Sequence, residues 1–300
     1  MTAESLNFFG QLYTKTSVQD QWVKFWQAVA DRVGRNPYVV GYDPINEPFP
    51  SSYFKDPEYV FVPGSFDHDA LEPTYARAFQ EAYKPADPKA LMFFEASEFP
   101  DEMGILGGLV FNLGFEKPPG GELNSPNHVL NDHTYCFQLI NALYGAEAAT
   151  KSLQWNKTVC RGWHEDRIGT RAQDAAKLGI PLFISEFGGC GEDQSGVDEI
   201  TNVGEVCDEH LAGWAYWQYK NFNDPTTRPS AFFEPLFHED GTLQTPKVKA
   251  LARTYAPYTQ GALSSLKFDS TTAAFEMAFD YSSSVEAPTV IFWSEEYWYP

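Results

Sequence analysis

Residues 38–48 of the chain read YVVGYDPINEP, and this stretch is the clearest indication of the chain's architecture. Its β-branched and aromatic beginning predicts a short buried strand. Asn46 and Glu47 follow directly, so an amide and a carboxylate stand at the carboxyl end of an apolar strand. Residues 181–188 read PLFISEFG, repeat the pattern and place Glu186 at the end of a second strand.

The same alternation of helix and strand runs through most of the chain. Apolar residues at helical spacing predict helices, and short apolar runs between them predict strands. The expected helices are residues 19–33, 73–83, 164–178, 197–210 and 246–255, and the expected strands are residues 38–42, 90–95, 129–135, 181–186 and 213–217. This order is typical of a parallel sheet with crossover helices.

Residues able to do chemistry or to stack on a ligand lie at or just past the ends of the expected strands. They are Glu47, Glu95, Glu186 and Trp217. A (β/α)8 TIM barrel carries its active site at this edge. A closed barrel needs eight β/α units, and an open sheet of five strands would expose unpaired edges. We therefore expect an α/β chain whose residues 1–258 form a catalytic (β/α)8 barrel lacking its first three β/α units.

The sequence pattern changes after Tyr258. Residues 266–269 and 274–279 alternate apolar and polar side chains with period two, and residues 289–293 are a further strand candidate. This pattern predicts the start of an antiparallel β-sandwich. We expect residues 259–300 to be a truncated C-terminal domain of that type.

The composition narrows the possible partners. The chain carries a formal net charge of −20 and has a pI near 4.6. Such an acidic protein has no basic stripe to neutralise phosphates, which argues against a nucleic-acid partner. Aromatic residues make up 16% of the chain. This excess suits stacking on sugar rings or lipid chains, although the core accounts for the larger share.

The four cysteines show no CxxC spacing, which argues against a zinc site, and we expect no metal or organic cofactor. Cys190 and Cys207 could close a short loop as a disulfide if the protein is secreted. Four buried thiols are an equally good interpretation. No apolar stretch is long enough to span a bilayer, and residues 1–10 show no secretory signal.

Glu47 and Glu186 together predict hydrolysis of a glycosidic bond. Retaining glycosidases use two carboxyl groups about 5–5.5 Å apart, one as acid/base and the other as nucleophile. Glu47 beside Asn46 suits the proton donor, because the amide can bind a sugar hydroxyl while the acid protonates the leaving oxygen. The competing interpretation of residues 46–48 is a simple turn with a solvated glutamate.

Three further residues suit a sugar-binding site. His133 and Tyr135 are two residues apart on the intervening strand and therefore share one face. A tyrosine hydroxyl can orient a nucleophilic carboxylate, and a histidine can bind a sugar hydroxyl. The indole of Trp217 offers a stacking surface for a pyranose ring. Taken singly, each of these residues is more often part of a core.

Four strings carry a family resemblance: YDPINEPF at residues 42–49, DHTYC at residues 132–136, ISEFG at residues 184–188 and WAYWQYK at residues 214–220. They resemble the endoglycoceramidase branch of glycoside hydrolase family five. The resemblance implies cleavage, with retention of configuration, of the bond between the oligosaccharide and ceramide of glycosphingolipids.

By this resemblance the residues named above take defined roles. Glu47 is the acid/base, Glu186 is the nucleophile, and Asn46 binds the sugar. His133 and Tyr135 line the site, and Trp217 is the sugar platform. The resemblance also implies that the partner is a glycosphingolipid substrate and that no cofactor is needed.

Two alternatives remain open. One is another family-five enzyme, either a β-glucanase or a glucosylceramidase, and the other is an inactive truncated product that only binds glycolipid. If the chain is an enzyme of the endoglycoceramidase type, we expect an extracellular or lysosomal/vacuolar location. The loop of residues 104–126 could form an apolar groove for lipid or touch a membrane surface, or its leucines could belong to the core. The sequence leaves the oligomeric state open.

Overall fold

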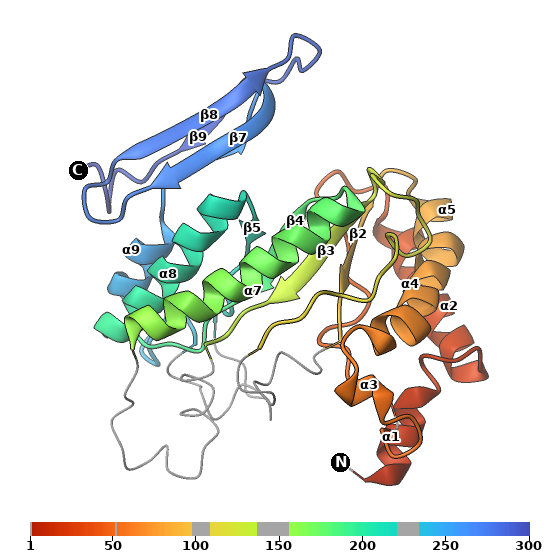
Figure 1. Cartoon of the computed structure of the whole chain (residues 1–300). Helices are drawn as coiled ribbons and strands as arrows, with labels where there is room; N and C mark the ends of the chain where they lie inside the picture. Colours follow the sequence, from red (N-terminus) through yellow and green to blue (C-terminus); the bar gives the residue numbers. More distant parts are fainter. Residues whose placement is uncertain (1, 52, 98–108, 137–155, 221–233) are drawn as a thin grey trace. The chain divides into compact units, whose positions relative to one another are not determined.

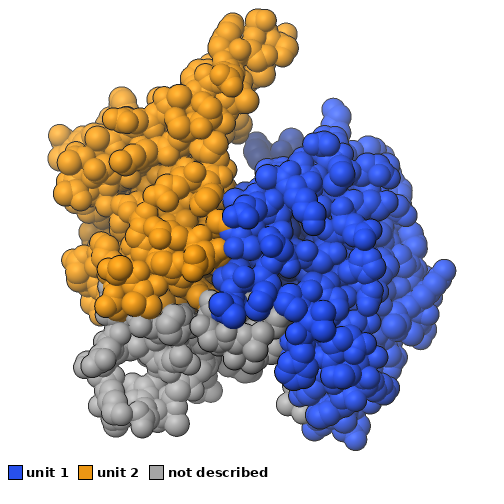
Figure 2. All heavy atoms as spheres, in the orientation of Figure 1, with its two compact units in different colours: residues 1–132, 170–183 blue, residues 133–169, 184–300 orange. Residues whose placement is uncertain are grey.

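The computed structural model of the chain consists of two compact units (Figure 2). Unit 1 contains Met1–Asp132 and Thr170–Phe183, and unit 2 contains His133–Gly169 and Ile184–Pro300. The structure describes residues 2–51, 53–97, 109–136, 156–220 and 234–300. No helix among these described residues is long and apolar enough to cross a membrane.

A five-stranded parallel sheet organises the chain and confirms the expected order of strands (Figure 1). Its strands lie in sequence order: β1 (Gly41–Tyr42), β2 (Leu91–Glu95), β3 (His128–His133), β4 (Leu182–Glu186) and β5 (Gly213–Trp214). The register pairs Gly41 with Leu91 and Met92 with His128. Strand β3 is buried along its whole length, as is typical of a strand covered on both faces.

Helical segments precede, separate or follow these strands, except that none lies between β2 and β3 among the described residues. They are α1 (Ala3–Gly10), α2 (Ser17–Val33), α3 (Glu58–Phe61), α4 (Glu72–Arg77), α5 (Lys84–Ala86), α7 (Lys157–Leu178), α8 (Gln194–His210) and α9 (Thr245–Leu251), with π-helical turns η1 (Asp67–Leu71) and η2 (Ala78–Tyr83) beside α4. Helix α7 begins seven residues before the expected start. Its beginning is explained by Asn156, whose side-chain oxygen accepts hydrogen bonds from the N–H groups of Thr158 and Val159.

Three expected elements are shorter than their sequence patterns predicted. The strand expected over residues 38–42 is regular only in β1, because Val39 N–H bonds the Asn36 carbonyl in a turn. Tyr38 in that turn is 91% exposed. Strand β5 ends at Trp214, and helix α9 ends at Leu251.

The residues after α9 form antiparallel strands, as the period-two pattern predicted. Strand β6 (Tyr255–Tyr258) pairs with β9 (Val290–Phe292), and β7 (Gly261–Phe268) pairs with β8 (Phe275–Tyr281) in the long ribbon of Figure 1. Tyr255 therefore begins a strand instead of ending a helix. The domain boundary at residue 258, the complete sandwich and the three further barrel units stay predictions.

The cysteine pairing differs from the pairing considered above. Cys136 and Cys160 form a disulfide, and Cys190 and Cys207 are free, buried thiols. The physical reason is the length of α8, which begins just after Cys190 and has Cys207 in its last turn. A helix of 17 residues spans about 25 Å, which is far beyond the reach of a disulfide.

Candidate active site

Glu186 is the centre of a polar cluster in unit 2. It is the last residue of β4, where the strand's apolar pattern ends, and 15% of its side chain is exposed. The Tyr135 hydroxyl donates a hydrogen bond of 2.9 Å to Glu186 Oε2. His133 Nδ1 lies 3.6 Å from the same oxygen, and its side chain is only 2% exposed. The structure thus brings together three residues that the sequence had singled out.

The alternation of side chains at the end of β3 explains this arrangement. His133 ends the strand and Tyr135 follows two positions later, so both side chains reach the same carboxylate. The His133 carbonyl accepts a 2.8 Å hydrogen bond from Arg167 Nε of α7. The predicted shared face of the two residues is therefore confirmed.

Trp217 lies in the same unit and is half-buried. The backbone N–H of Trp217 donates to the Phe187 carbonyl at 2.9 Å, and residue 217 forms an isolated bridge with Gly188. Gly188 has a φ of 155°, and a Cβ there would overlap the Trp217 carbonyl oxygen. A glycine at residue 188 is thus required for the close approach. Trp214 packs edge-on against Phe187, with ring centroids 5.5 Å apart.

Asn46 and Glu47 belong to unit 1, in the segment that follows β1. Glu47 has a φ of 48°, a left-handed conformation that is uncommon for a residue other than glycine. Its N–H donates a 2.8 Å hydrogen bond to Glu95 Oε2. Glu95 ends β2, is 1% exposed and accepts the Tyr75 hydroxyl at its carbonyl oxygen. Buried Glu95 therefore supports the backbone of the proposed acid/base residue.

Three residues at or near the strand ends received no role from the sequence. Asn131 Nδ2 of β3 donates a 2.7 Å hydrogen bond to Asp43 Oδ2, which follows β1. Glu95 had been noted as a strand-ending residue, but without a function. A charged side chain at or just past the end of an apolar strand is the signal that could have identified Asp43 and Glu95, whereas Asn131 lies inside β3.

The chain belongs to glycoside hydrolase family 5. Residues 6–223 match the family model "Cellulase (glycosyl hydrolase family 5)", and residues 253–300 match the family's C-terminal domain. These matches confirm the family resemblance and the glycosidase class that it implies. They also identify the five-stranded sheet as part of a cellulase-like TIM-barrel fold.

Several curated relatives are endoglycoceramidases. Those of Cyanea nozakii and Hydra vulgaris are 25% and 26% identical over 272 and 294 residues, which cover 90% and 97% of this chain. The matched regions are 48% and 49% of those relatives, so the chain spans about half of their length.

Solved structures support the fold. Endo-glycoceramidase II from Rhodococcus sp. superimposes with a TM-score of 0.73 at 20% identity, over 98% of this chain and 59% of that one. Its complex with ganglioside GM3 gives a TM-score of 0.72. A mannotriose complex of Cel5A from Thermotoga maritima gives 0.56 at 15% identity.

Proposed function

We propose that this chain carries the catalytic residues of a retaining β-glycosidase that separates the oligosaccharide from the ceramide of glycosphingolipids. The observation that supports the proposal most is the 2.9 Å hydrogen bond from the Tyr135 hydroxyl to Glu186. A nucleophilic carboxylate must be ionised and held in one orientation, and a phenol donor serves both needs.

The reaction has two steps. Glu186 attacks the anomeric carbon while the Glu47 carboxyl protonates the departing ceramide oxygen, which leaves a glycosyl-enzyme. Glu47 then removes a proton from water, and the resulting hydroxide releases the glycan from Glu186. Neither step requires a metal or organic cofactor.

The remaining residues bind the sugar. Exposed Asn46 offers its amide to a sugar hydroxyl, and the half-buried indole of Trp217 is the stacking platform. His133 and Tyr135 line the site and keep Glu186 in place.

The ceramide part of the proposal is supported by the names of the curated relatives. In the loop expected to hold lipid, Leu109 is 59% exposed, whereas Phe115 is buried 5.1 Å from the Phe94 ring. The described part of this loop therefore contains both solvent-facing and core residues, and Leu106 lies outside the described residues. We propose that the exposed part contacts lipid or a membrane surface.

An extracellular or lysosomal/vacuolar location completes the proposal. The Cys136–Cys160 disulfide supports it, because disulfides form and persist in oxidising compartments. The alternatives are a β-glucanase or glucosylceramidase of the same family, and an inactive glycolipid-binding product.

The test incubates the purified protein with ganglioside GM3, glucosylceramide and a soluble β-glucan. Release of intact oligosaccharide from the ganglioside supports the proposal, while hydrolysis of the glucan alone would overturn it.

Glu186→Gln should lower kcat by at least about a thousandfold while glycolipid binding persists. Glu122→Gln, at a carboxylate whose side chain is 88% exposed, is the matched control and should keep wild-type kcat. If the wild-type protein binds glycolipid but does not hydrolyse it, the alternative of an inactive glycolipid-binding protein is favoured.

A further inference from the structure

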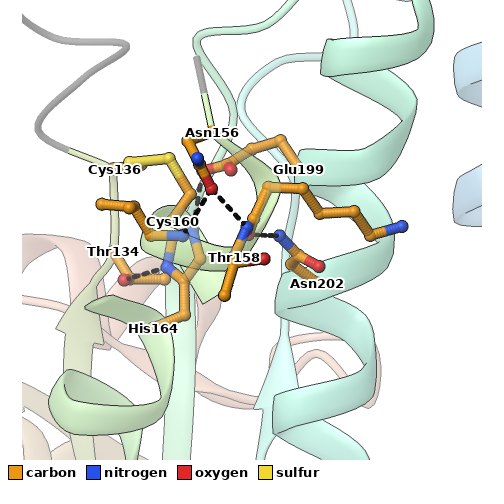
Figure 3. Close-up of a disulfide and its surroundings, with 10 residues drawn as sticks. Thr134, Cys136, Asn156, Thr158, Cys160, His164, Glu199 and Asn202 are labelled. Atoms are coloured by element: carbon orange, nitrogen blue, oxygen red, sulfur yellow. Dashed lines mark hydrogen bonds and ion pairs between the residues drawn. A yellow bond between two sulfur atoms is a disulfide. The ribbon is translucent and has the colours of Figure 1, made fainter. Parts of the chain in front are cut away.

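The strand end that carries His133 and Tyr135 has a second face, which points to helix α7. Thr134 and Cys136 alternate with the two site residues and face His164 and Cys160 of the helix (Figure 3). Thr134 Oγ1 lies 2.8 Å from His164 Nδ1, and Cys136 is bonded covalently to Cys160. Tyr135 is thus flanked on both sides by residues that are tied to α7.

The α7 residues that make these ties form one buried row. Cys160, His164 and Arg167 are spaced by four and three positions, so they lie on one face of the helix. All three are at most 1% exposed. Arg167 adds the hydrogen bond to the His133 carbonyl. The row therefore holds the backbone on either side of Tyr135.

Glu199 of helix α8 completes the arrangement behind His164. Its Oε1 lies 2.7 Å from His164 Nε2, and both side chains are at most 2% exposed. Among the described residues, the other ring nitrogen, Nδ1, contacts Thr134. Asn202, three residues further along α8, donates to the Lys157 carbonyl and ties the first turn of α7 to the same helix (Figure 3).

The energetics favour a role in orientation over one in stability. A buried ionic or strongly polar pair contributes little net stability compared with apolar residues of similar size. Its geometry, however, is narrowly defined, because both partners must keep their hydrogen bonds. Thr134 also donates its N–H to the Glu186 carbonyl at 2.9 Å, so one residue contacts both the buried pair and the nucleophile's backbone.

We propose that a group of buried residues holds the Tyr135 hydroxyl in hydrogen-bonding position against Glu186. The group, which we call the clamp, consists of Thr134, His164, Glu199 and the Cys136–Cys160 disulfide. Thr134 and His164 are positioning residues, since they act on the reaction only through Tyr135 and the backbone of Glu186. The inference rests on the proposed function and assigns these roles to residues outside the sugar-binding set.

The experiment compares Thr134→Val, which keeps the shape but removes the hydroxyl, with Thr134→Ser, which keeps the hydroxyl. Thr134→Val should lower kcat about tenfold with KM changed by less than about twofold, because a misdirected Tyr135 affects the chemical step more than binding. Thr134→Ser should restore most of the lost kcat. Thr201→Val is the matched control, since its buried hydroxyl bonds only the Val197 carbonyl of its own helix among the described contacts.

A second readout does not depend on activity. The carbon-13 resonance of the Tyr135 ring carbon that bears the hydroxyl, assigned with Tyr135→Phe, reports the contact with Glu186. It should move in Thr134→Val, return in Thr134→Ser and stay unchanged in Thr201→Val. A Thr134→Val protein with wild-type kcat and an unmoved resonance would overturn the clamp, as would a fall in kcat without movement of the resonance. If the wild-type protein cleaves none of the glycosides, the proposed function fails. The Tyr135 resonance in the Thr134 variants then remains as the test of the clamp.

Discussion

The two proposed catalytic carboxylates are held by different means. Glu186 is held through its side chain, which receives the Tyr135 hydroxyl. Glu47 is held through its backbone, whose left-handed conformation is supported by the bond to Glu95. Such a conformation costs on the order of 1–3 kcal/mol and persists where the surrounding structure enforces it. The buried carboxylate of Glu95 provides that support.

Lys247 allows a prediction on the pH dependence of stability. Its ammonium is fully buried, donates to the Glu234 and Pro235 carbonyls and lies 5.5 Å from the centre of the Tyr216 ring. Burial lowers the pKa of Lys247 from 10.5 to about 8. Between these two values the unfolded chain holds the proton and the folded chain does not, so the contribution of Lys247 to stability rises with pH.

The measurement is the free energy of unfolding of wild-type protein minus that of Lys247→Met, from pH 7 to 10.5. The difference should be flat below pH 8 and increase above it. Taking a difference cancels the titration of groups that Lys247 does not influence. Cys190 is influenced by Lys247, but burial raises its pKa to about 12, which lies above this pH range. A difference that does not change across this range would contradict the prediction.

At the level of elements, the disulfide joins the end of β3 to the first turn of α7. Cys136 and Cys160 are 24 positions apart, and closing a loop of this length restricts the unfolded chain. Loop-closure entropy predicts that the Cys136→Ser/Cys160→Ser double variant loses about 3 kcal/mol of unfolding free energy.

Denaturant unfolding with and without reductant measures this loss. Reductant should destabilise the wild-type protein by a similar amount and leave the double variant unchanged. Equal stabilities of the two proteins under oxidising conditions would show that the disulfide contributes nothing. Cys190→Ala, at a free thiol, is the control and should keep the wild-type response to reductant.

At the scale of the whole molecule, a buried arginine is one of the residues that connect the C-terminal strands to the helical part of unit 2. Arg253 is 3% exposed, pairs with Asp208 of α8 and lies 5.1 Å from the centre of the Phe268 ring of β7. The Phe268 N–H also donates to the Asp208 carboxylate at 3.1 Å. Arg253 and Asp208 thus share the contact between α8 and the β7–β8 ribbon.

Arg253→Met should destabilise the protein by about 3 kcal/mol, because it leaves the Asp208 carboxylate, which is only 11% exposed, without its cation. The β7–β8 ribbon should then lose hydrogen-exchange protection before β3 and β4 do. Arg161→Met removes a partly exposed network with Glu165, Glu205 and Glu209 and should cost less than about 1 kcal/mol. Equal effects of the two substitutions, measured by hydrogen exchange and denaturant unfolding, would contradict this role of Arg253.

The sequence by itself determined the alternation of elements and the placement of polar residues at strand ends. Apolar periodicity is a local property, so β2, β4 and β8 could be predicted within about two residues, whereas only the last three residues of β7 were predicted. The strand-end strings also carried the family resemblance, which the family models confirm. The separation of His133 and Tyr135 by two residues was enough to predict their shared face.

Only the tertiary structure decided how residues distant in the sequence are paired. The disulfide joins Cys136 to Cys160 and leaves Cys190 free, because α8 separates Cys190 from Cys207. The contact of His164 with Glu199 joins two helices, and the left-handed backbone of Glu47 depends on support from a neighbouring strand. Periodicity contains no information about such partners, since they are selected by packing between elements and not by the pattern within one.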